Sequence, residues 1–102
     1  MRPLFRTVAT PRARRHIRIA ARWWLENRSA APDLFERELA QAFDRLSKSP
    51  DSGRQPRHKA PPGTLYIRMP KTGYLLYYRP EHGYDLVVVL AVWHENRLSP
   101  RL

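Results

Sequence analysis

The sequence predicts an α+β fold, in which a small, mostly antiparallel sheet carries an N-terminal helical hairpin on one face. The expected element order is β-α-α-β-β-β. Apolar residues recur at helical spacing twice in the first half of the chain. Alternating and continuous apolar runs follow after residue 63, separated by short turns. A length of 102 residues suits a single domain, 1–102, with one core.

The first half predicts a short strand followed by two helices. Residues 4–10 mix Phe, Val and Thr, which favours a strand, and Pro11 ends it and opens a helix. Helical spacing then continues over residues 12–28, with Ala, Ile and Trp on one face. After a short break, a second helix is expected to open at Pro32 and end near residue 49. The short link makes the two helices antiparallel neighbours.

The second half predicts three strands joined by tight turns. Residues 64–69 alternate between apolar and polar, which indicates a half-buried strand, and residues 70–73 form a hairpin turn. Residues 74–79 form the next strand, and residues 80–83 form another turn. The last run, 84–93, is continuous and rich in β-branched residues, so we expect a strand buried on both faces.

The charge of the chain points to an anionic partner. Its net charge is +10, from 19 basic and 9 acidic residues, and sixteen of the basic residues are Arg. Arg favours bidentate contact with phosphate or carboxylate, so nucleic acid or an acidic protein segment is expected. A composition bias toward Arg is the alternative explanation. The Pro-rich loop 50–63 adds four further basic or His side chains that suit nucleic-acid contact.

The composition also excludes several classes of function. Without Cys, the chain has no disulfide, thiol nucleophile or thiolate metal site. Its four His are scattered, so we expect neither a metal site nor a cofactor. No apolar run reaches the roughly 20 residues of a membrane span. Residues 1–24 resemble a transit peptide in composition, but they carry a predicted strand and helix, so a cytoplasmic protein is expected.

Several short motifs follow one another along nearly the whole chain. They are Trp23-Trp24, Ala31-Pro32-x-x-Phe35, Leu46-x-x-x-Pro50-x-x-Gly53, Tyr74-x-x-Tyr77-Tyr78-Arg79 and Trp93-His94-x-x-Arg97. No single motif is very specific, but their order and spacing together are. In this combination the chain resembles the RelE/ParE superfamily of bacterial toxins from type II toxin–antitoxin systems.

This resemblance implies a growth-inhibiting toxin with one of two targets. ParE-like members inhibit DNA gyrase and need no nuclease site, whereas RelE-like members are endoribonucleases that cut mRNA on the ribosome. The Ala-Pro-x-Leu-Phe helix start, the Pro50-x-x-Gly53 exit and the Trp-His-x-x-Arg ending look ParE-like. We therefore expect a gyrase inhibitor neutralised by a cognate antitoxin. A ribosome-dependent mRNA endoribonuclease is the alternative.

The nuclease alternative needs a proton acceptor, a proton donor and cations for the phosphate. His94 suits the acid or base role, and Tyr77 or Tyr78 suits the proton donor. Across the predicted hairpin, Arg68 and Arg79 are expected to approach each other. The candidate phosphate clamps are Arg68, Arg79 and Arg97.

The tyrosines, His94 and Arg79 also have a structural interpretation. The tyrosines suit sheet packing, His94 suits a strand end, and Arg79 suits an ion pair with Glu81 or Asp85. RelE-like nucleases tend to carry a denser basic cluster than the single Arg68 on its strand. Whether the chain is an enzyme therefore stays open.

In the ParE-like interpretation the same region binds its target without catalysis. The expected contributors are Arg68 and Arg79 on the sheet and the segment with His94, Arg97 and Arg101. A third interpretation is a basic RNA-binding module without toxicity, because aromatic and Arg side chains share a predicted sheet face.

The first predicted helix suits an acidic antitoxin. Arg14, Arg18 and Arg22 lie four residues apart, a spacing at which like charges disfavour a helix. An anionic partner would relieve this repulsion. With the exposed side of Trp23, they form the expected landing surface for an acidic tail that folds on binding. Charge reversal at Arg18 and Arg22 is expected to weaken the complex in a salt-dependent way.

Overall fold

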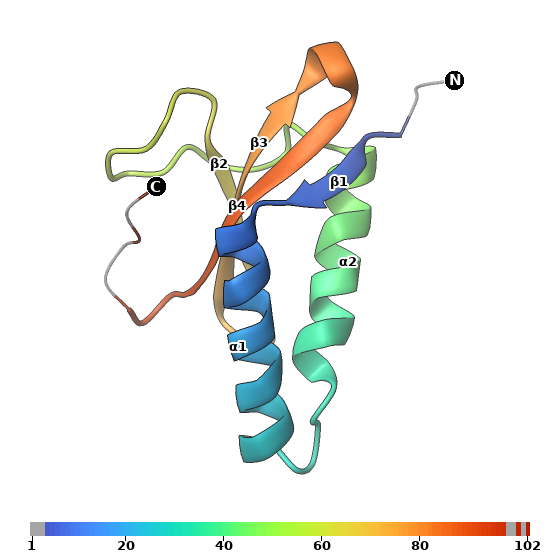
Figure 1. Ribbon diagram of the computed structural model, residues 1–102, viewed down its shortest axis with the longest axis vertical. Helices are drawn as coiled ribbons and strands as arrows, with labels where there is room; N and C mark the ends of the chain where they lie inside the picture. Colours follow the sequence, from blue (N-terminus) through green and yellow to red (C-terminus); the bar gives the residue numbers. More distant parts are fainter. Residues whose placement is uncertain (1–3, 98–99, 101) are drawn as a thin grey trace.

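Two helices and four strands appear in the predicted order in the computed structural model, which describes residues 4–97, 100 and 102. Figure 1 shows both helices side by side against the sheet. The predicted α+β class and the helical hairpin are confirmed. The elements are β1 (Arg6–Ala9), α1 (Pro11–Asn27), α2 (Leu34–Lys48), β2 (Leu65–Met69), β3 (Tyr74–Glu81), a short 3₁₀ turn (His82–Tyr84) and β4 (Leu86–His94).

The sheet has the strand order β1-β4-β3-β2. β2, β3 and β4 form an antiparallel meander. β1 adds to β4 in parallel, with Arg6 opposite Leu86 and Ala9 opposite Val89. The first and last strands therefore lie side by side, and β4 takes the central position that its apolar sequence predicts.

The core lies between the helices and one face of the sheet. α1 contributes the small buried side chains Ala13 and Ala20, which allow it to pack closely. α2 contributes the apolar face of an amphipathic helix, from Phe35 to Leu46. The sheet contributes the buried side chains Ile67, Met69, Leu76, Tyr78, Val87, Val89 and Val92.

β4 is buried completely on the face toward the helices and only in part on the other, so the predicted burial on both faces is confirmed only in part. Val87 and Val89 are buried against the helices, whereas Val88 and Leu90 are half-buried on the other face. On that other face Ala91 is fully buried, opposite Tyr77. A bulge at Leu90 interrupts the pairing, since Tyr78 lies opposite Val89 and Tyr77 lies opposite Ala91.

The ends of the helices follow local capping chemistry. The Thr10 hydroxyl accepts a hydrogen bond from the Ala13 N–H at 3.1 Å, and Pro11 occupies the first turn of α1. α2 begins at Leu34, two residues later than predicted. Pro32 lies in the preceding turn, where the Leu34 N–H donates to the Ala31 carbonyl at 3.2 Å.

Pro80 lies inside β3 and not in a turn as predicted. β2 pairs with β3 only as far as Tyr78, so β3 is an edge strand at Pro80, where a missing N–H is tolerated. The chain instead reverses at His82–Tyr84 and Asp85, which has a φ of 51°. The predicted hairpin turn at residues 70–73 is confirmed, with Gly73 at a φ of 80°.

Candidate functional site

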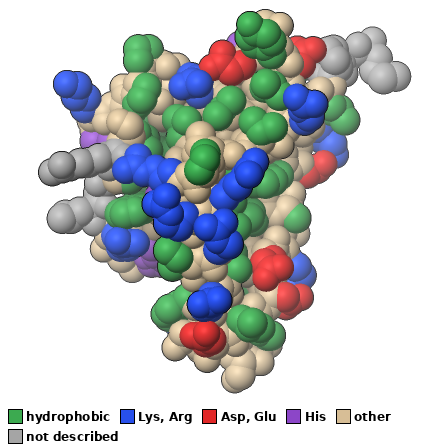
Figure 2. Space-filling view, in the orientation of Figure 1, with side chains coloured by type: hydrophobic (Ala, Val, Ile, Leu, Met, Phe, Trp, Pro, Cys, Tyr) green, Lys and Arg blue, Asp and Glu red, His purple; other side chains and the backbone are tan. Residues whose placement is uncertain are grey.

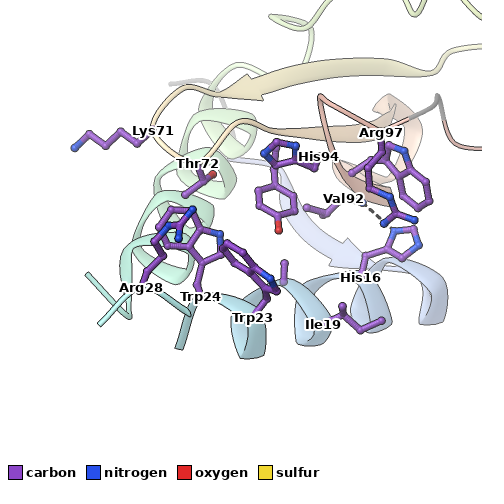
Figure 3. Close-up of a pocket in the computed structure, with 13 residues that line it drawn as sticks. His16, Ile19, Trp23, Trp24, Arg28, Lys71, Thr72, Val92, His94 and Arg97 are labelled. Carbon is purple, nitrogen blue, oxygen red and sulfur yellow. Dashed lines mark hydrogen bonds between the residues drawn. The ribbon is translucent and has the colours of Figure 1, made fainter. Parts of the chain in front are cut away.

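A groove of about 710 Å³ opens between α1, the end of β4 and the turn that joins β2 to β3. Its aromatic wall comes from Trp23 and Trp24 on α1 and from Tyr74 and Trp93 on the sheet. Figure 3 shows Trp23 and Trp24 at the opening, with His16 and Ile19 farther along the same helix and His94 across from them. An apolar wall with a few polar groups is typical of a binding site.

Two arginines stack on the tryptophans at the groove. The Arg28 guanidinium lies 4.8 Å from the Trp23 ring centroid and 5.6 Å from that of Trp24. The Arg97 guanidinium lies 3.9 Å from the Trp93 ring centroid. Stacking restricts both guanidinium groups, and Arg28 Nη1 also donates a hydrogen bond to the Asn27 carbonyl at 3.3 Å. The groove therefore suits an occupant with apolar side chains and negative charges.

His16 connects α1 to the part of β4 that β1 does not cover. The Val92 N–H donates a hydrogen bond to His16 Nδ1 at 3.1 Å, which requires that nitrogen to be unprotonated (Figure 3). Burial lowers the pKa of His16 below its ordinary 6.5, and the nearby Arg12, Arg15 and Arg97 lower it further. Geometry and charge therefore both favour the neutral imidazole.

Tyr74 and His94 form the sheet side of the groove. Their ring centroids lie 5.1 Å apart in an edge-to-face contact. His94 Nδ1 accepts a hydrogen bond from the Asn96 N–H at 3.2 Å. Burial raises the pKa of the Tyr74 phenol, and the neighbouring Trp24 and Arg97 offset part of this rise. The Trp24 Nε1–H is buried beside the Tyr74 phenol, but their contact falls short of regular hydrogen-bond geometry.

Glu38 holds the turn that forms one edge of the groove, and the sequence analysis missed it. Its carboxylate accepts hydrogen bonds from the Lys71 N–H at 2.6 Å, the Thr72 N–H at 2.9 Å and the Thr72 hydroxyl at 2.7 Å. It is only 4% exposed. The signal was a carboxylate on the apolar face of a helix, three residues after Phe35, where only a buried donor could satisfy it.

Arg68 and Arg79 do not approach each other, and that prediction is wrong. Arg68 lies opposite Leu75, four positions before Arg79 on β3, which corresponds to about 13 Å along the strand. Arg68 pairs with Glu95, at 3.0 Å from Nη2 to Oε2. Arg79 pairs with Glu81, as the structural interpretation expected.

The other candidate residues are dispersed as well. Tyr78 is fully buried in the core, and its hydroxyl accepts the Gly53 N–H at 2.9 Å. Tyr77 lies on the opposite face of the sheet, beneath His58, with its hydroxyl 3.4 Å from His58 Nε2. His94 and Arg97 border the groove instead. The structure therefore does not bring the six candidate residues of the nuclease alternative together, and Arg101 lies outside the described residues.

The predicted landing surface on α1 is exposed but divided. Arg14, Arg18 and Arg22 are exposed, and Trp23 is 42% exposed. Figure 2 shows Lys and Arg side chains gathered over α1. Nine residues correspond to two and a half helical turns, so Arg14 lies on the opposite side of α1 from Trp23. One flat surface that contains all four residues is therefore not formed.

The described residues provide no obvious metal or membrane site. Within residues 4–97, 100 and 102, no group of three or more His, Cys, Asp or Glu side chains is arranged to hold a metal ion. In the same part of the chain, no helix is long and apolar enough to cross a bilayer.

Comparison with known structures gives related folds at low sequence identity. The toxin–antitoxin complex RelBE2 from Mycobacterium tuberculosis contains a chain that is 24% identical, with a TM-score of 0.66 over 95% of this chain and 98% of that one. A chain of the chromosomal ParDE system from P. aeruginosa is 10% identical, with a TM-score of 0.67 over 89% and 96%. The isolated E. coli RelE toxin is 18% identical, with a TM-score of 0.55 over 93% and 88%.

A family model gives the more specific assignment. A search of curated proteins found no match. In contrast, residues 8–98 match the model of the ParE toxin of the type II toxin–antitoxin system parDE. The matched segment runs from β1 past the end of β4 and includes both helices and the residues around the groove. The chain therefore belongs to the ParE toxin family of type II toxin–antitoxin systems, within the RelE/ParE superfamily.

Proposed function

We propose that this toxin arrests growth in the cytoplasm by binding DNA gyrase and not by cutting RNA. The observation that carries this proposal is the dispersal of the residues that a metal-free nuclease would need. A general acid or base must lie within hydrogen-bond reach of the reacting group, next to cations that stabilise the phosphate. Here the candidate groups occupy both faces of the sheet.

Three of the candidate residues already have partners within the protein, which agrees with a binding role. The hydroxyl of Tyr78 is buried and already accepts a hydrogen bond, so it cannot reach a substrate without rearrangement of the core. Arg68 and Arg79 each pair with a glutamate. An Arg that is already paired with a Glu can still contact a partner at the edge of a protein–protein interface. A few other residues supply most of the affinity of such an interface.

The target-binding surface that we propose contains Arg68, Arg79, His94 and Arg97. His94 and Arg97 border the groove, whereas Arg68 and Arg79 lie on the sheet face away from the helices. A partner that contacts all four must therefore reach around the end of the sheet. This extended arrangement suits a protein partner better than a small substrate.

We also propose that a cognate antitoxin neutralises the toxin through an acidic, amphipathic tail. RelBE2 and ParDE, whose toxin chains share this fold, are toxin–antitoxin systems. On this chain, the exposed Trp23 and the neighbouring Arg22 suit such a tail at the groove side of α1. Arg18 lies farther around the helix, so charge reversal is expected to weaken the complex more at Arg22 than at Arg18.

The first test is induced expression in a bacterial host without antitoxin, followed by separate labelling of DNA and protein synthesis. Early arrest of DNA synthesis with an SOS response is the expected result, and purified toxin should inhibit gyrase supercoiling in vitro. Early arrest of translation with cleaved mRNA would instead establish the RelE-like endoribonuclease and contradict the proposal.

Substitution of the two sheet arginines separates binding from catalysis. Arg68→Gln and Arg79→Gln are each expected to weaken toxicity less than about tenfold, and together to weaken it more, because contacts at the edge of an interface contribute little individually. The matched control is Arg37→Gln on α2, outside the proposed surface. Complete loss of toxicity in one single variant with an intact fold would point to a catalytic role.

A further inference from the structure

The outer side of α1 carries a row of cations that neither the groove nor the ion pairs use. Arg14, Arg15, Arg18 and Arg22 are all exposed. At 3.6 residues per turn, they occupy about 100° of the helix circumference, opposite the buried Ala13. We call these four residues the Arg ridge. They include the three arginines of the predicted landing surface and add Arg15.

No carboxylate neutralises the Arg ridge among the residues that the structure describes. The ion pairs in that part of the chain involve other cations, namely Arg37, Lys48, Arg68, Arg79 and His82. α1 has no acidic residue in its first turn. Arg14 and Arg15 also lie near the positive end of the helix dipole, so the local field is strongly positive.

We propose that the Arg ridge binds the phosphate backbone of duplex DNA. Guanidinium groups bind phosphate in a bidentate manner, and every cation on the ridge is Arg. From Arg14 to Arg22 the helix rises about 12 Å, several times the axial rise of about 3.4 Å between successive phosphates of one DNA strand. The ridge thus spans enough phosphates for several simultaneous contacts.

The shape of the ridge favours DNA over RNA. An α-helix with its side chains is about 10–12 Å wide, close to the width of the B-DNA major groove, about 12 Å. A convex helix can therefore lie along that groove with arginines directed toward its phosphate walls. The deep and narrow major groove of A-form RNA does not admit a helix.

The shape also argues against an acidic peptide over Arg14, Arg15 and Arg18, whereas Arg22, at the end of the ridge, borders the proposed antitoxin surface at Trp23. A folding tail needs apolar contacts as well as charge. Ile19 and Trp23, both exposed, lie on the groove side of α1 and not on the ridge. Leu25 is also exposed, but it lies beyond the end of the ridge at Arg22.

The proposal does not depend on the identity of the toxin's target. Its test contains only the full chain and a fluorescein-labelled DNA duplex of about 20 base pairs, with anisotropy measured over a range of KCl concentrations. The ridge variant carries Arg14→Gln, Arg15→Gln and Arg18→Gln. The matched control carries Arg37→Gln, Arg45→Gln and Lys48→Gln on α2, which remove the same charge from exposed side chains that already have partners.

The ridge variant is expected to bind the duplex at least about tenfold more weakly at low salt, with a salt dependence reduced by up to about 2.7 in log–log slope. The α2 control should stay close to the wild type. Circular dichroism is used to check that both variants keep their helices. Because no gyrase is present, failure of the gyrase proposal would leave this result unchanged.

Four outcomes would overturn the proposal. Equal weakening in both variants would show a dependence on net charge alone, and no weakening in either would remove the ridge from DNA binding. Equal affinity and slope for an RNA duplex would show general attraction to phosphate. Loss of binding to polyglutamate or to anionic phosphatidylglycerol vesicles, with DNA binding retained, would assign the ridge to an acidic protein or a membrane surface.

Discussion

A single hydrogen bond at His16 connects the helical layer to the sheet beside the groove. The Val92 N–H belongs to the stretch of β4 that extends beyond its pairing with β1, so no neighbouring strand satisfies it. The imidazole replaces the missing strand at this position. Since only the neutral ring can accept this hydrogen bond, a charge on His16 and the bond exclude each other.

Acid is therefore expected to destabilise the protein through His16. Unfolded His16 has its ordinary pKa of 6.5, whereas burial and three arginines hold the folded pKa lower. As the pH falls below 6.5, the unfolded state takes up a proton that the folded state does not, so the free energy of unfolding decreases until the folded pKa is passed. Urea denaturation at about pH 7.5 and about pH 5 measures this decrease.

His16→Gln is the matched variant, because the Gln carbonyl can accept the Val92 N–H but does not titrate. It should lose less stability than the wild type between the two pH values. His82→Gln, which removes an exposed His paired with Asp51, serves as the control for a surface ion pair. An identical pH dependence in the wild type and His16→Gln would contradict the assignment.

The contacts made by individual residues were the hardest feature to predict from the sequence. The partner of Arg79 was among the expected pairings, because Glu81 is near in sequence. His16 and Glu38 have functions that depend on backbone groups far away in sequence, at Val92 and Thr72. Such contacts follow from the fold and leave only an indirect trace, a polar residue near an apolar helix face.

At the level of secondary structure, α1 places its charges against the usual preference of a helix. Its first turn contains no acidic residue and its last turn no basic residue. Cations near the start of a helix oppose the dipole, and Arg14, Arg18 and Arg22 repel one another at four-residue spacing. Packing of Ala13 and Ala20 against the core maintains the helix despite this arrangement.

Arg14→Glu is therefore expected to stabilise the protein, by about 0.5–1 kcal/mol at low salt. The carboxylate would lie near the positive end of the helix dipole and four residues before Arg18. Urea denaturation at low and high salt measures the gain, which should shrink as salt is added. Arg57→Glu in the loop changes the net charge equally outside a helix, and an equal gain there would attribute the effect to net charge.

The elements themselves were largely predictable, because periodicity and capping residues are local. The order of the elements along the chain and the helical hairpin followed from apolar spacing and turn residues. The predictions were wrong where the conformation of a strand depends on its neighbouring strand. Pro80 is tolerated in β3 only because β2 has already ended, and the bulge at Leu90 has no signal in the sequence.

At the scale of the whole molecule, the predicted cluster of catalytic residues does not form, again because neighbouring strands set the positions of the side chains. The prediction placed Arg68 and Arg79 near each other because their strands form a hairpin. The register places them four positions apart, and the alternation of the strands places Tyr77 and Tyr78 on opposite faces. Register and face depend on the assembled sheet, whereas the family resemblance, which depends on order and spacing, was confirmed.

The pairing of β1 with β4 joins residues 80 positions apart, as between Arg6 and Leu86. Long-range pairing of this kind requires closure of a large loop, so it forms late in folding. In refolding, the Arg6 and Thr10 amides, which donate to Asp85 and Val89, should become protected only together with β4. Pulsed hydrogen exchange measures this order, with α2 amides as the reference, and earlier protection of Arg6 would contradict it.

The same long-range pairing has a consequence for how the toxin is made. A ribosome synthesises both helices, β2 and β3 before it reaches β4. Until Val92, Trp93 and His94 have emerged from the exit tunnel, the groove lacks its sheet wall and β1 lacks a partner. The nascent chain therefore cannot form the groove before β4 has emerged, so an antitoxin already in the cell can meet the groove as soon as it forms.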